Sequence, residues 1–216
     1  MTVDNLRAAA ADHALQIVGI CQTDPTDGLG NGTIVLLGPN EPHFWSTFVA
    51  SPEYMDGQPN SMDRWSTRNI DALADKVAGR ALYPFGQPAR PFLTWALRSG
   101  ECWASHVGLL VHRKYGLLVS FRGAVLVKAT NHNPVEHTSP CETCETKPCL
   151  TVCPVGALTD KGYDLRACHD FLDAAEGKSC LSQGCTVRMS CPLSQSVGRA
   201  ANQSAFHMAS FHPGTS

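Results

Sequence analysis

The sequence has no long apolar run, no basic block and no marked excess of charge of either sign. Its 216 residues carry a formal net charge of −2, and only 17% of them are charged. A membrane-spanning helix needs roughly 18 or more apolar residues in a row, so no membrane partner is expected. A nucleic-acid-binding face concentrates Lys and Arg, so the near-neutral charge also argues against nucleic acid as a partner.

The first residues do not have the layout of a secretory signal. Asp4, Arg7 and Asp12 interrupt the alanine-rich stretch over residues 1–15. A signal peptide instead has a basic start followed by an uninterrupted apolar stretch. The hydrophobic content of 43% is ordinary for a folded chain. We therefore expect a folded protein in the cytoplasm.

Cysteine is distributed unevenly, and its placement divides the chain. Eight of the ten cysteines lie between Cys141 and Cys191. In a secreted protein this density indicates disulfides, whereas clustered thiols in the cytoplasm are more often metal ligands. The composition changes near residue 130, which predicts two domains over residues 1–130 and 131–216, with a linker at 131–134. The second domain has few large apolar residues, so we expect it to fold around a bound group.

Hydrophobic periodicity predicts a mixture of helices and strands in the first domain. Helices are expected over residues 6–15, 43–50, 61–78 and 92–99. Strands are expected over residues 16–21, 33–37, 81–85, 107–112, 117–121 and 124–128, the last three as a meander. The fold class is therefore α+β, with an α/β sandwich followed by a small cysteine-rich module.

The first cysteine motif has the spacing C-x2-C-x4-C-x3-C-P. It consists of Cys141, Cys144, Cys149 and Cys153, with Pro154 directly after. Bacterial ferredoxins use C-x2-C-x2-C-x3-C-P, in which three cysteines bind one [4Fe–4S] cluster and the fourth binds the other cluster of a pair. A tight loop can wrap around three corners of a cubane, while a cysteine further along the chain points away from it. The motif therefore predicts two clusters and requires four more cysteines.

Four more cysteines follow, and the last of them begins a second Cys-Pro pair. We assign one cluster to Cys141, Cys144, Cys149 and Cys191. We assign the other cluster to Cys153, Cys168, Cys180 and Cys185. The C-x4-C-x5-C spacing of the second set leaves the partition between the two clusters open.

Other interpretations of these cysteines are a structural zinc site, a set of disulfides, or one cluster with four spare thiols. Structural zinc usually uses two C-x2-C pairs, and this sequence has one such pair in the region. Cys21 and Cys102 lie outside the region and are predicted to be buried small hydrophobic residues.

The remaining candidate residues carry weaker signals. His106 and His112 flank a predicted strand and could meet a cofactor, although a lone histidine beside a strand is more often structural. The tryptophans are expected in the core rather than in a ring-stacking site; they are Trp45, Trp65, Trp95 and Trp103. Cationic residues among the cysteines either tune a cluster or are solvated surface charges; they are Lys147, Lys161, Lys178 and Arg188. The sequence identifies no catalytic residue.

The order of the cysteine motifs resembles the two-cluster ferredoxin module of epoxyqueuosine reductases and reductive dehalogenases. The shared order is a four-cysteine motif, a lone cysteine after an Asp-x-Arg-like segment (here Asp164-Leu-Arg-Ala-Cys168), and a last group ending in Cys-Pro. Residues 108–118 also resemble the hairpin that precedes the clusters in these enzymes. The resemblance implies a nitroreductase-like sandwich of the corrinoid-binding kind, followed by a ferredoxin-like iron–sulfur module. Cobalamin or a flavin is therefore considered as a further cofactor. A tRNA partner is implied by family analogy alone.

We expect from these patterns an iron–sulfur redox protein with two [4Fe–4S] clusters for one-electron transfer. Its partner would be a redox protein or a small-molecule electron acceptor. An alternative is a corrinoid- or flavin-dependent reductase, an oxidoreductase in which the clusters feed electrons to a cofactor in the first domain. A third hypothesis is a module with structural metal and no redox function.

Overall fold

The computed structural model describes residues 3–130 and 137–213, which group into two compact units of a mixed α+β chain. The first unit comprises Met1–Cys102 and Ser120–His137, and the second comprises Trp103–Val119 and Thr138–Ser216. This division differs from the predicted boundary near residue 130, because residues 103–119 belong with the cysteine-rich unit. The predicted linker over residues 131–134 lies outside the described residues.

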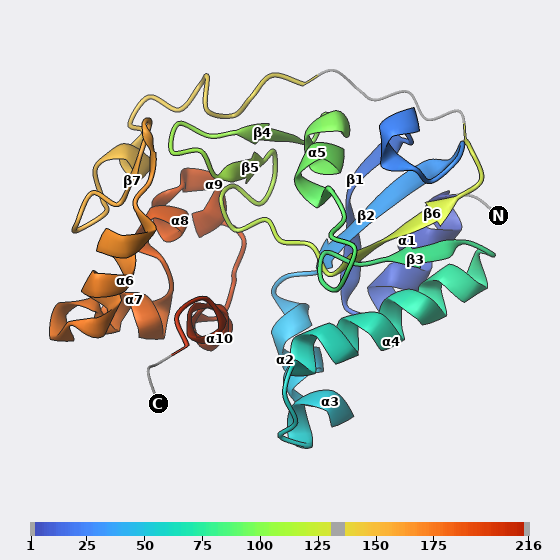
Figure 1. Ribbon diagram of the computed structural model, residues 1–216, viewed down its shortest axis with the longest axis horizontal. Helices are drawn as coiled ribbons and strands as arrows, with labels where there is room; N and C mark the ends of the chain where they lie inside the picture. Colours follow the sequence, from blue (N-terminus) through green and yellow to red (C-terminus); the bar gives the residue numbers. More distant parts are fainter. Residues whose placement is uncertain (1–2, 131–136, 214–216) are drawn as a thin grey trace. The chain divides into compact units, whose positions relative to one another are not determined.

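A four-stranded antiparallel sheet forms the centre of the first unit (Figure 1). Its strands are β1 (Leu15–Gln22), β2 (Thr33–Pro39), β3 (Arg80–Leu82) and β6 (Gly123–Val127), in the order β1-β2-β6-β3. Every residue of β2 is buried, as is typical of a central strand covered on both faces. The unbroken run of β-branched and leucine residues in this segment predicts such a strand.

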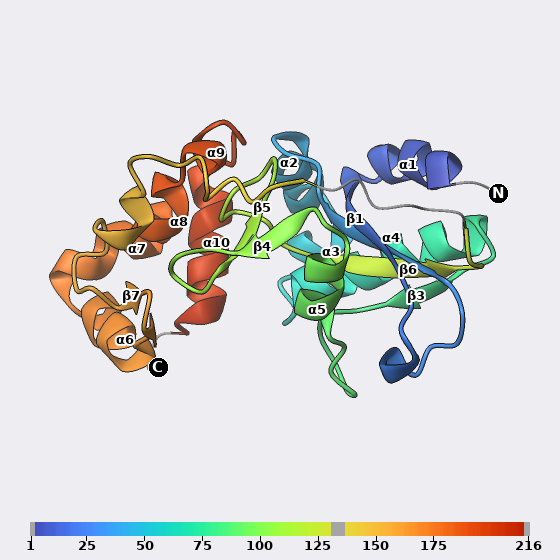
Figure 2. The same ribbon diagram turned by 90° about the horizontal axis from the view of Figure 1, so that it is seen from above.

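Helices cover both faces of this sheet. They are α1 (Val3–Asp12), α2 (His43–Val49), α3 (Pro52–Met55), α4 (Ser61–Lys76) and α5 (Phe92–Arg98). A Cβ at Gly123 would touch α4, whereas a Cβ at Gly19 would touch Ser99 at the end of α5. These two glycines pair with the neighbouring residues Leu37 and Leu36, so they face opposite sides of the sheet. The helices α4 and α5 therefore lie on opposite faces, as Figures 1 and 2 show.

An ion pair between Asp27 and Arg98 holds the glycine-rich loop over residues 24–32 against α5. The Asp27 carboxylate is 2% exposed and accepts hydrogen bonds from Arg98 at 2.6 Å and from Trp95 Nε1 at 2.9 Å. Burial raises the pKa of Asp27, but hydrogen bonds from Arg98, the Asp24 backbone and Trp95 outweigh it and bring the pKa to about 2. The loop is thus held by Asp27 at the end of the short helix η1 (Pro25–Asp27).

The predicted three-strand meander is only partly correct. The first of its strands is shorter than predicted and forms β5 (Leu110–His112), which pairs with β4 (Cys102–Ala104). The last forms β6. The middle strand, predicted over residues 117–121, is wrong, because these residues form a turn and irregular backbone.

The backbone around Leu117 has side-chain partners in place of a neighbouring strand. The Leu117 N–H donates to Ser194 Oγ at 3.0 Å, and its carbonyl accepts from Arg188 at 2.8 Å. The Leu118 carbonyl accepts from Arg199 at 2.7 Å. Hydrophobic periodicity does not show that side chains distant in sequence form hydrogen bonds with these backbone groups. The strand prediction is wrong for this reason.

Short elements make up the rest of the second unit. They are η2 (Pro148–Leu150), β7 (Leu158–Thr159), β8 (Gly162–Tyr163), α6 (Leu165–Asp173), η3 (Ala175–Gly177), α7 (Lys178–Gln183), α8 (Thr186–Ser190), α9 (Pro192–Gln195) and α10 (Ala201–Phe211). The longest of them, α10, packs against α7. Across residues 3–130 and 137–213, no helix combines the length and apolar character needed to cross a membrane.

Candidate metal centre

The eight clustered cysteines lie in two groups of four. The Cys141 quartet consists of Cys141, Cys144, Cys149 and Cys191. The Cys153 quartet consists of Cys153, Cys168, Cys180 and Cys185. Cys149 interacts electrostatically with the other three members of its quartet, and Cys168 interacts with the other three members of its own. The two quartets have the same membership as the sets assigned from the spacing.

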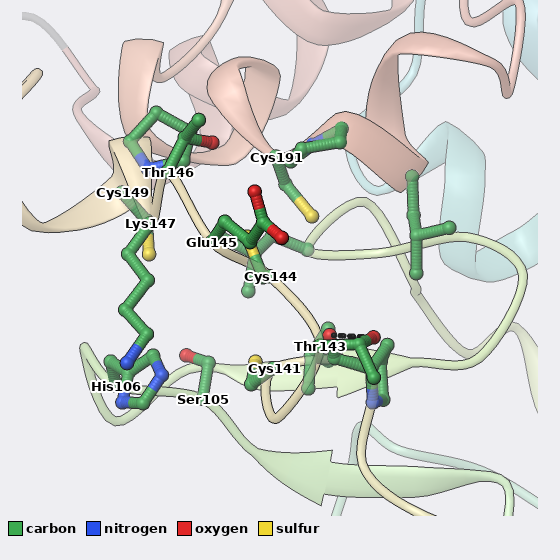
Figure 3. Close-up of a pocket in the computed structure, with 16 residues that line it drawn as sticks. Ser105, His106, Cys141, Thr143, Cys144, Glu145, Thr146, Lys147, Cys149 and Cys191 are labelled. Carbon is green, nitrogen blue, oxygen red and sulfur yellow. Dashed lines mark hydrogen bonds between the residues drawn. The ribbon is translucent and has the colours of Figure 1, made fainter.

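All four thiols of the Cys141 quartet line one cavity of about 350 Å³ within the second unit. Figure 3 shows the sulfur atoms of Cys141, Cys149 and Cys191 directed toward a common space. Apolar side chains form part of the wall, and Ser105 and His106 line its hairpin side. The cavity therefore combines four convergent thiols with a partly apolar lining.

Local backbone geometry explains the unusual x4 spacing between Cys144 and Cys149. Lys147 has φ +40°, a left-handed conformation that is rare for a residue with a side chain. It is the N-cap of η2, which carries Cys149 and buries it to 8% exposure. The left-handed turn at Lys147 thus accommodates the two extra residues and returns Cys149 to the cavity.

Cys191 reaches the Cys141 quartet because Gly116 leaves room for its sulfur. A Cβ at Gly116 would lie 2.8 Å from Cys191 Sγ and 2.7 Å from the Ser194 nitrogen, and Gly116 also has φ +54°. Only glycine satisfies both the close contact and the left-handed backbone without strain. The hydrogen bond between Leu117 and Ser194 holds the same contact in place.

Three members of the Cys153 quartet lie in or at the start of short helices, whereas Cys153 itself lies in irregular backbone. The Asp164 side chain accepts a hydrogen bond from the Ala167 N–H at 2.9 Å and so caps α6, which positions Cys168. Cys180 lies in α7, and Gly184 ends that helix with φ +100°. A Cβ at position 184 would lie 2.7 Å from the Ser204 Cβ. The four-residue spacing between Cys180 and Cys185 therefore requires glycine at this position.

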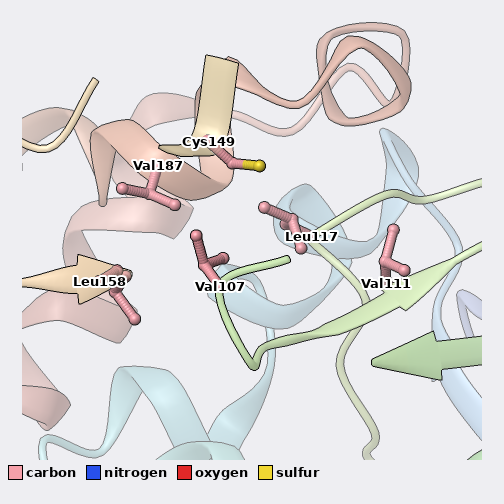
Figure 4. Close-up of a cluster of buried hydrophobic side chains, with 6 residues drawn as sticks. All are labelled: Val107, Val111, Leu117, Cys149, Leu158 and Val187. Carbon is pink, nitrogen blue, oxygen red and sulfur yellow. The ribbon is translucent and has the colours of Figure 1, made fainter. Parts of the chain in front are cut away.

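The helix α8 separates the two quartets. Cys185 is its N-cap and Cys191 its C-cap, so the x5 spacing places one cysteine at each end of the helix. Six residue steps at 1.5 Å each span about 9 Å along a helix axis. Both quartets pack against one apolar cluster that includes Val187 of α8 (Figure 4). The quartets are therefore neighbours, held apart by one short helix.

Hydrogen-bond donors reach the sulfur atoms of both quartets. The Ala157 N–H donates to Cys153 Sγ, and the Tyr163 hydroxyl donates to Cys168 Sγ, each at 3.3 Å. The backbone N–H of His106 donates a hydrogen bond to Cys141 Sγ. Such donors lower the charge density on thiolate ligands and raise the potential of a bound metal group.

Burial and neighbouring thiols raise the pKa of cysteines in both quartets. Burial raises the pKa of Cys149, and the neighbouring Cys141, Cys144 and Cys191 raise it further. Burial likewise raises the pKa of Cys168, against the hydrogen bond from Tyr163. Four thiolates in one place repel one another, and a positively charged metal core relieves this repulsion.

The described residues contain neither a disulfide nor a group of side chains placed around a single metal ion. Four thiolates around one zinc, with Zn–S of about 2.3 Å, have sulfur atoms about 3.8 Å apart. Among the described residues, no three Cys, His, Asp or Glu side chains are placed to hold one metal ion. All ten cysteines are free thiols. A [4Fe–4S] cubane differs from a single zinc ion in that each of its four thiolates binds a different iron.

The other candidates from the sequence have structural surroundings. Cys21 and Cys102 are each 1% exposed, and burial raises their pKa to about 11 and about 12, so both are inert. His112 is buried, and its Nδ1 accepts from the backbone N–H groups of Lys114 and Tyr115. Trp45, Trp65 and Trp95 are buried in the core, and Trp103 is partly buried.

Sequence reasoning did not identify Ser105, Gly116, Tyr163 or Ser194 as parts of the site. Ser105 and Gly116 lie upstream of the first cysteine motif, so only the fold brings them to the quartet. Tyr163 precedes Cys168 by five residues, and this proximity is the one signal that could have identified it.

No family model, curated protein or solved structure matches the chain.

Proposed function

We propose that this protein is an iron–sulfur redox protein that holds two [4Fe–4S] clusters and transfers single electrons. The observation that carries the proposal is the crossing of the two cysteine sets. Cys153 joins the quartet made mainly by downstream cysteines, and Cys191 joins the quartet made by the first motif. The same crossing occurs between the ligands of two-cluster ferredoxins. Each quartet supplies the four thiolates that one such cluster requires.

When bound, each cluster would accept and release one electron. The chain's own residues would control this exchange. The apolar cluster that includes Val187 packs against cysteines of both quartets and would limit the access of water to bound clusters. Exposed aliphatic side chains flank Cys149 and Cys153, namely Leu150, Val152 and Val155, and they offer a contact surface for a redox partner protein.

The resemblance found in the sequence adds detail to the proposal. The first unit would be a nitroreductase-like sandwich, and the second a ferredoxin-like module. Free thiols persist in the reducing cytoplasm, which is the proposed compartment. A reductase with cobalamin or a flavin in the first unit is tested by equilibrium binding of each cofactor to the anaerobic protein. Binding of either one would extend the proposal from an electron carrier to an enzyme.

The decisive experiment compares two buried cysteines in the full chain prepared without oxygen. Cys149→Ala removes a proposed ligand of the Cys141 quartet, and Cys102→Ala removes another buried thiol, which lies outside both quartets. We expect Cys149→Ala to lose about half of the iron and of the electrons taken up from dithionite, because one four-iron cluster is lost. Cys102→Ala keeps both. Equal iron in Cys149→Ala and the unaltered protein would refute the proposal.

A further inference from the structure

Ser105 carries a buried hydroxyl that the described residues leave without a partner. The residue is 8% exposed, and no hydrogen bond to its Oγ is formed. Its backbone is already paired, because the N–H donates to the Leu109 carbonyl and the carbonyl accepts from the Gly108 N–H. Buried hydroxyls in folded proteins almost always have a partner. Residues 3–130 and 137–213 supply no such partner for this hydroxyl, which leaves it available to a group bound in the cavity.

The same cavity wall presents a second polar atom of this kind. His106 Nε2 is buried and lacks a hydrogen-bond partner among the described residues. The His106 side chain lines the cavity of the Cys141 quartet beside Ser105. Figure 3 shows both side chains on the hairpin side of the cavity, across from Cys149 and Cys191. Two residues with an unpaired polar side-chain atom thus line the cavity that the four thiols also line.

We propose that Ser105 and His106 donate hydrogen bonds to the cluster held by the Cys141 quartet and raise its reduction potential. This inference rests on the proposed function. Reduction adds one negative charge to the bound group, and hydrogen-bond donors stabilise the more negative state. The Ser105 hydroxyl acts in a buried setting where little water competes, so its effect is stronger than that of an exposed dipole.

Charged side chains at the cavity do not account for the same effect. The cavity is also lined by Lys147, which is partly buried, and by Glu145, which is exposed. Their charges are opposite in sign and accessible to salt, which screens them. The Cys153 quartet has a different side-chain donor, Tyr163. Removal of the Ser105 hydroxyl is therefore expected to act on one quartet alone.

The test uses the full chain with Cys168→Ala, so that only the Cys141 quartet is complete. Ser105→Ala is added to this background, and the reduction potential is measured by anaerobic titration followed by electron paramagnetic resonance. We expect a more negative potential with unchanged iron content. Electron–nuclear double resonance in deuterated water should lose one exchangeable coupling. Ser204→Ala is the matched control, because Ser204 is also a buried serine of this unit without a hydroxyl partner and lies outside the cavity lining.

His106 is tested separately in the same background. His106→Phe keeps an aromatic ring and the backbone N–H while removing Nε2, and the potential should again become more negative. An unchanged potential and an unchanged exchangeable coupling in Ser105→Ala would overturn the inference while leaving the proposed function intact. A protein that binds no iron–sulfur cluster before any substitution would overturn both.

Discussion

Replacing Gly116 with alanine should remove the cluster of the Cys141 quartet and leave the other cluster in place. The added Cβ would lie 2.7 Å from the Ser194 nitrogen and 2.8 Å from Cys191 Sγ. The first distance is about 0.8 Å shorter than ordinary packing contact. Metal ligands tolerate displacements of about 0.2 Å, so a shift of this size moves Cys191 out of its position.

The energetic cost has two parts. A non-glycine residue in the left-handed conformation costs about 1 kcal/mol, and φ at Gly116 is +54°. The steric overlap adds about 1–3 kcal/mol, as extra atoms in a packed interior do. The combined cost of about 2–4 kcal/mol falls on the contact that positions Cys191.

Gly108→Ala separates these two parts. Gly108 lies in the same hairpin with φ +72°, and a Cβ there would meet nothing within 4 Å. Iron and acid-labile sulfide are measured in both variants after anaerobic purification. We expect about four irons per chain in Gly116→Ala and about eight in Gly108→Ala. Equal iron content in the two variants would show that the contact with Cys191 has no role in cluster binding.

Three further predictions concern other parts of the chain. Tyr163→Phe removes the hydroxyl that donates to Cys168 Sγ at 3.3 Å, so the potential of the Cys153-quartet cluster should become more negative in a redox titration. Gly184→Ala brings a Cβ within 2.7 Å of the Ser204 side chain, so about half of the iron should be lost in a metal assay. Asp27→Asn should destabilise the first unit by about 2 kcal/mol at neutral pH, as measured by urea unfolding. The pKa of Asp27 is lowered from 3.8 to about 2, so its stabilisation is complete above pH 3.8 and disappears as the pH falls through about 2.

A control or a contradicting result accompanies each of these predictions. Gly156→Ala has φ +61° and open space around the Cβ, so it should keep all the iron that Gly184→Ala loses. A change in both cluster potentials in Tyr163→Phe would contradict a local hydrogen bond. Identical stability of Asp27→Asn and the unaltered protein at neutral pH would show that the ion pair with Arg98 contributes nothing.

The cysteine spacing indicates which thiols lie together because a short loop limits where each can point, and their role as cluster ligands stays a prediction. Three cysteines in one loop must share a site, and a cysteine beyond that loop must leave it. The five residues between Cys185 and Cys191 form the helix α8. Because the two cysteines lie at opposite ends of this helix, they belong to different quartets.

The parts that the sequence did not predict depend on distant contacts. The strand β2 was predictable because an unbroken apolar run suits a strand buried on both faces. The segment over residues 117–121 was not, because Ser194, Arg188 and Arg199 take the backbone groups that a neighbouring strand would use. No local sequence pattern predicts such hydrogen-bond partners. For the same reason the sequence does not predict that Ser105 and Gly116 lie beside the Cys141 quartet. Both residues lie in the segment over 103–119, which the fold brings to the cysteine-rich unit.

The most direct test of the central claim is the iron content and Mössbauer spectrum of the full chain after oxygen-free purification. Two occupied quartets predict about eight irons per chain and the spectrum of [4Fe–4S] clusters. Protein without iron, or with one zinc per quartet in its place, would contradict the account.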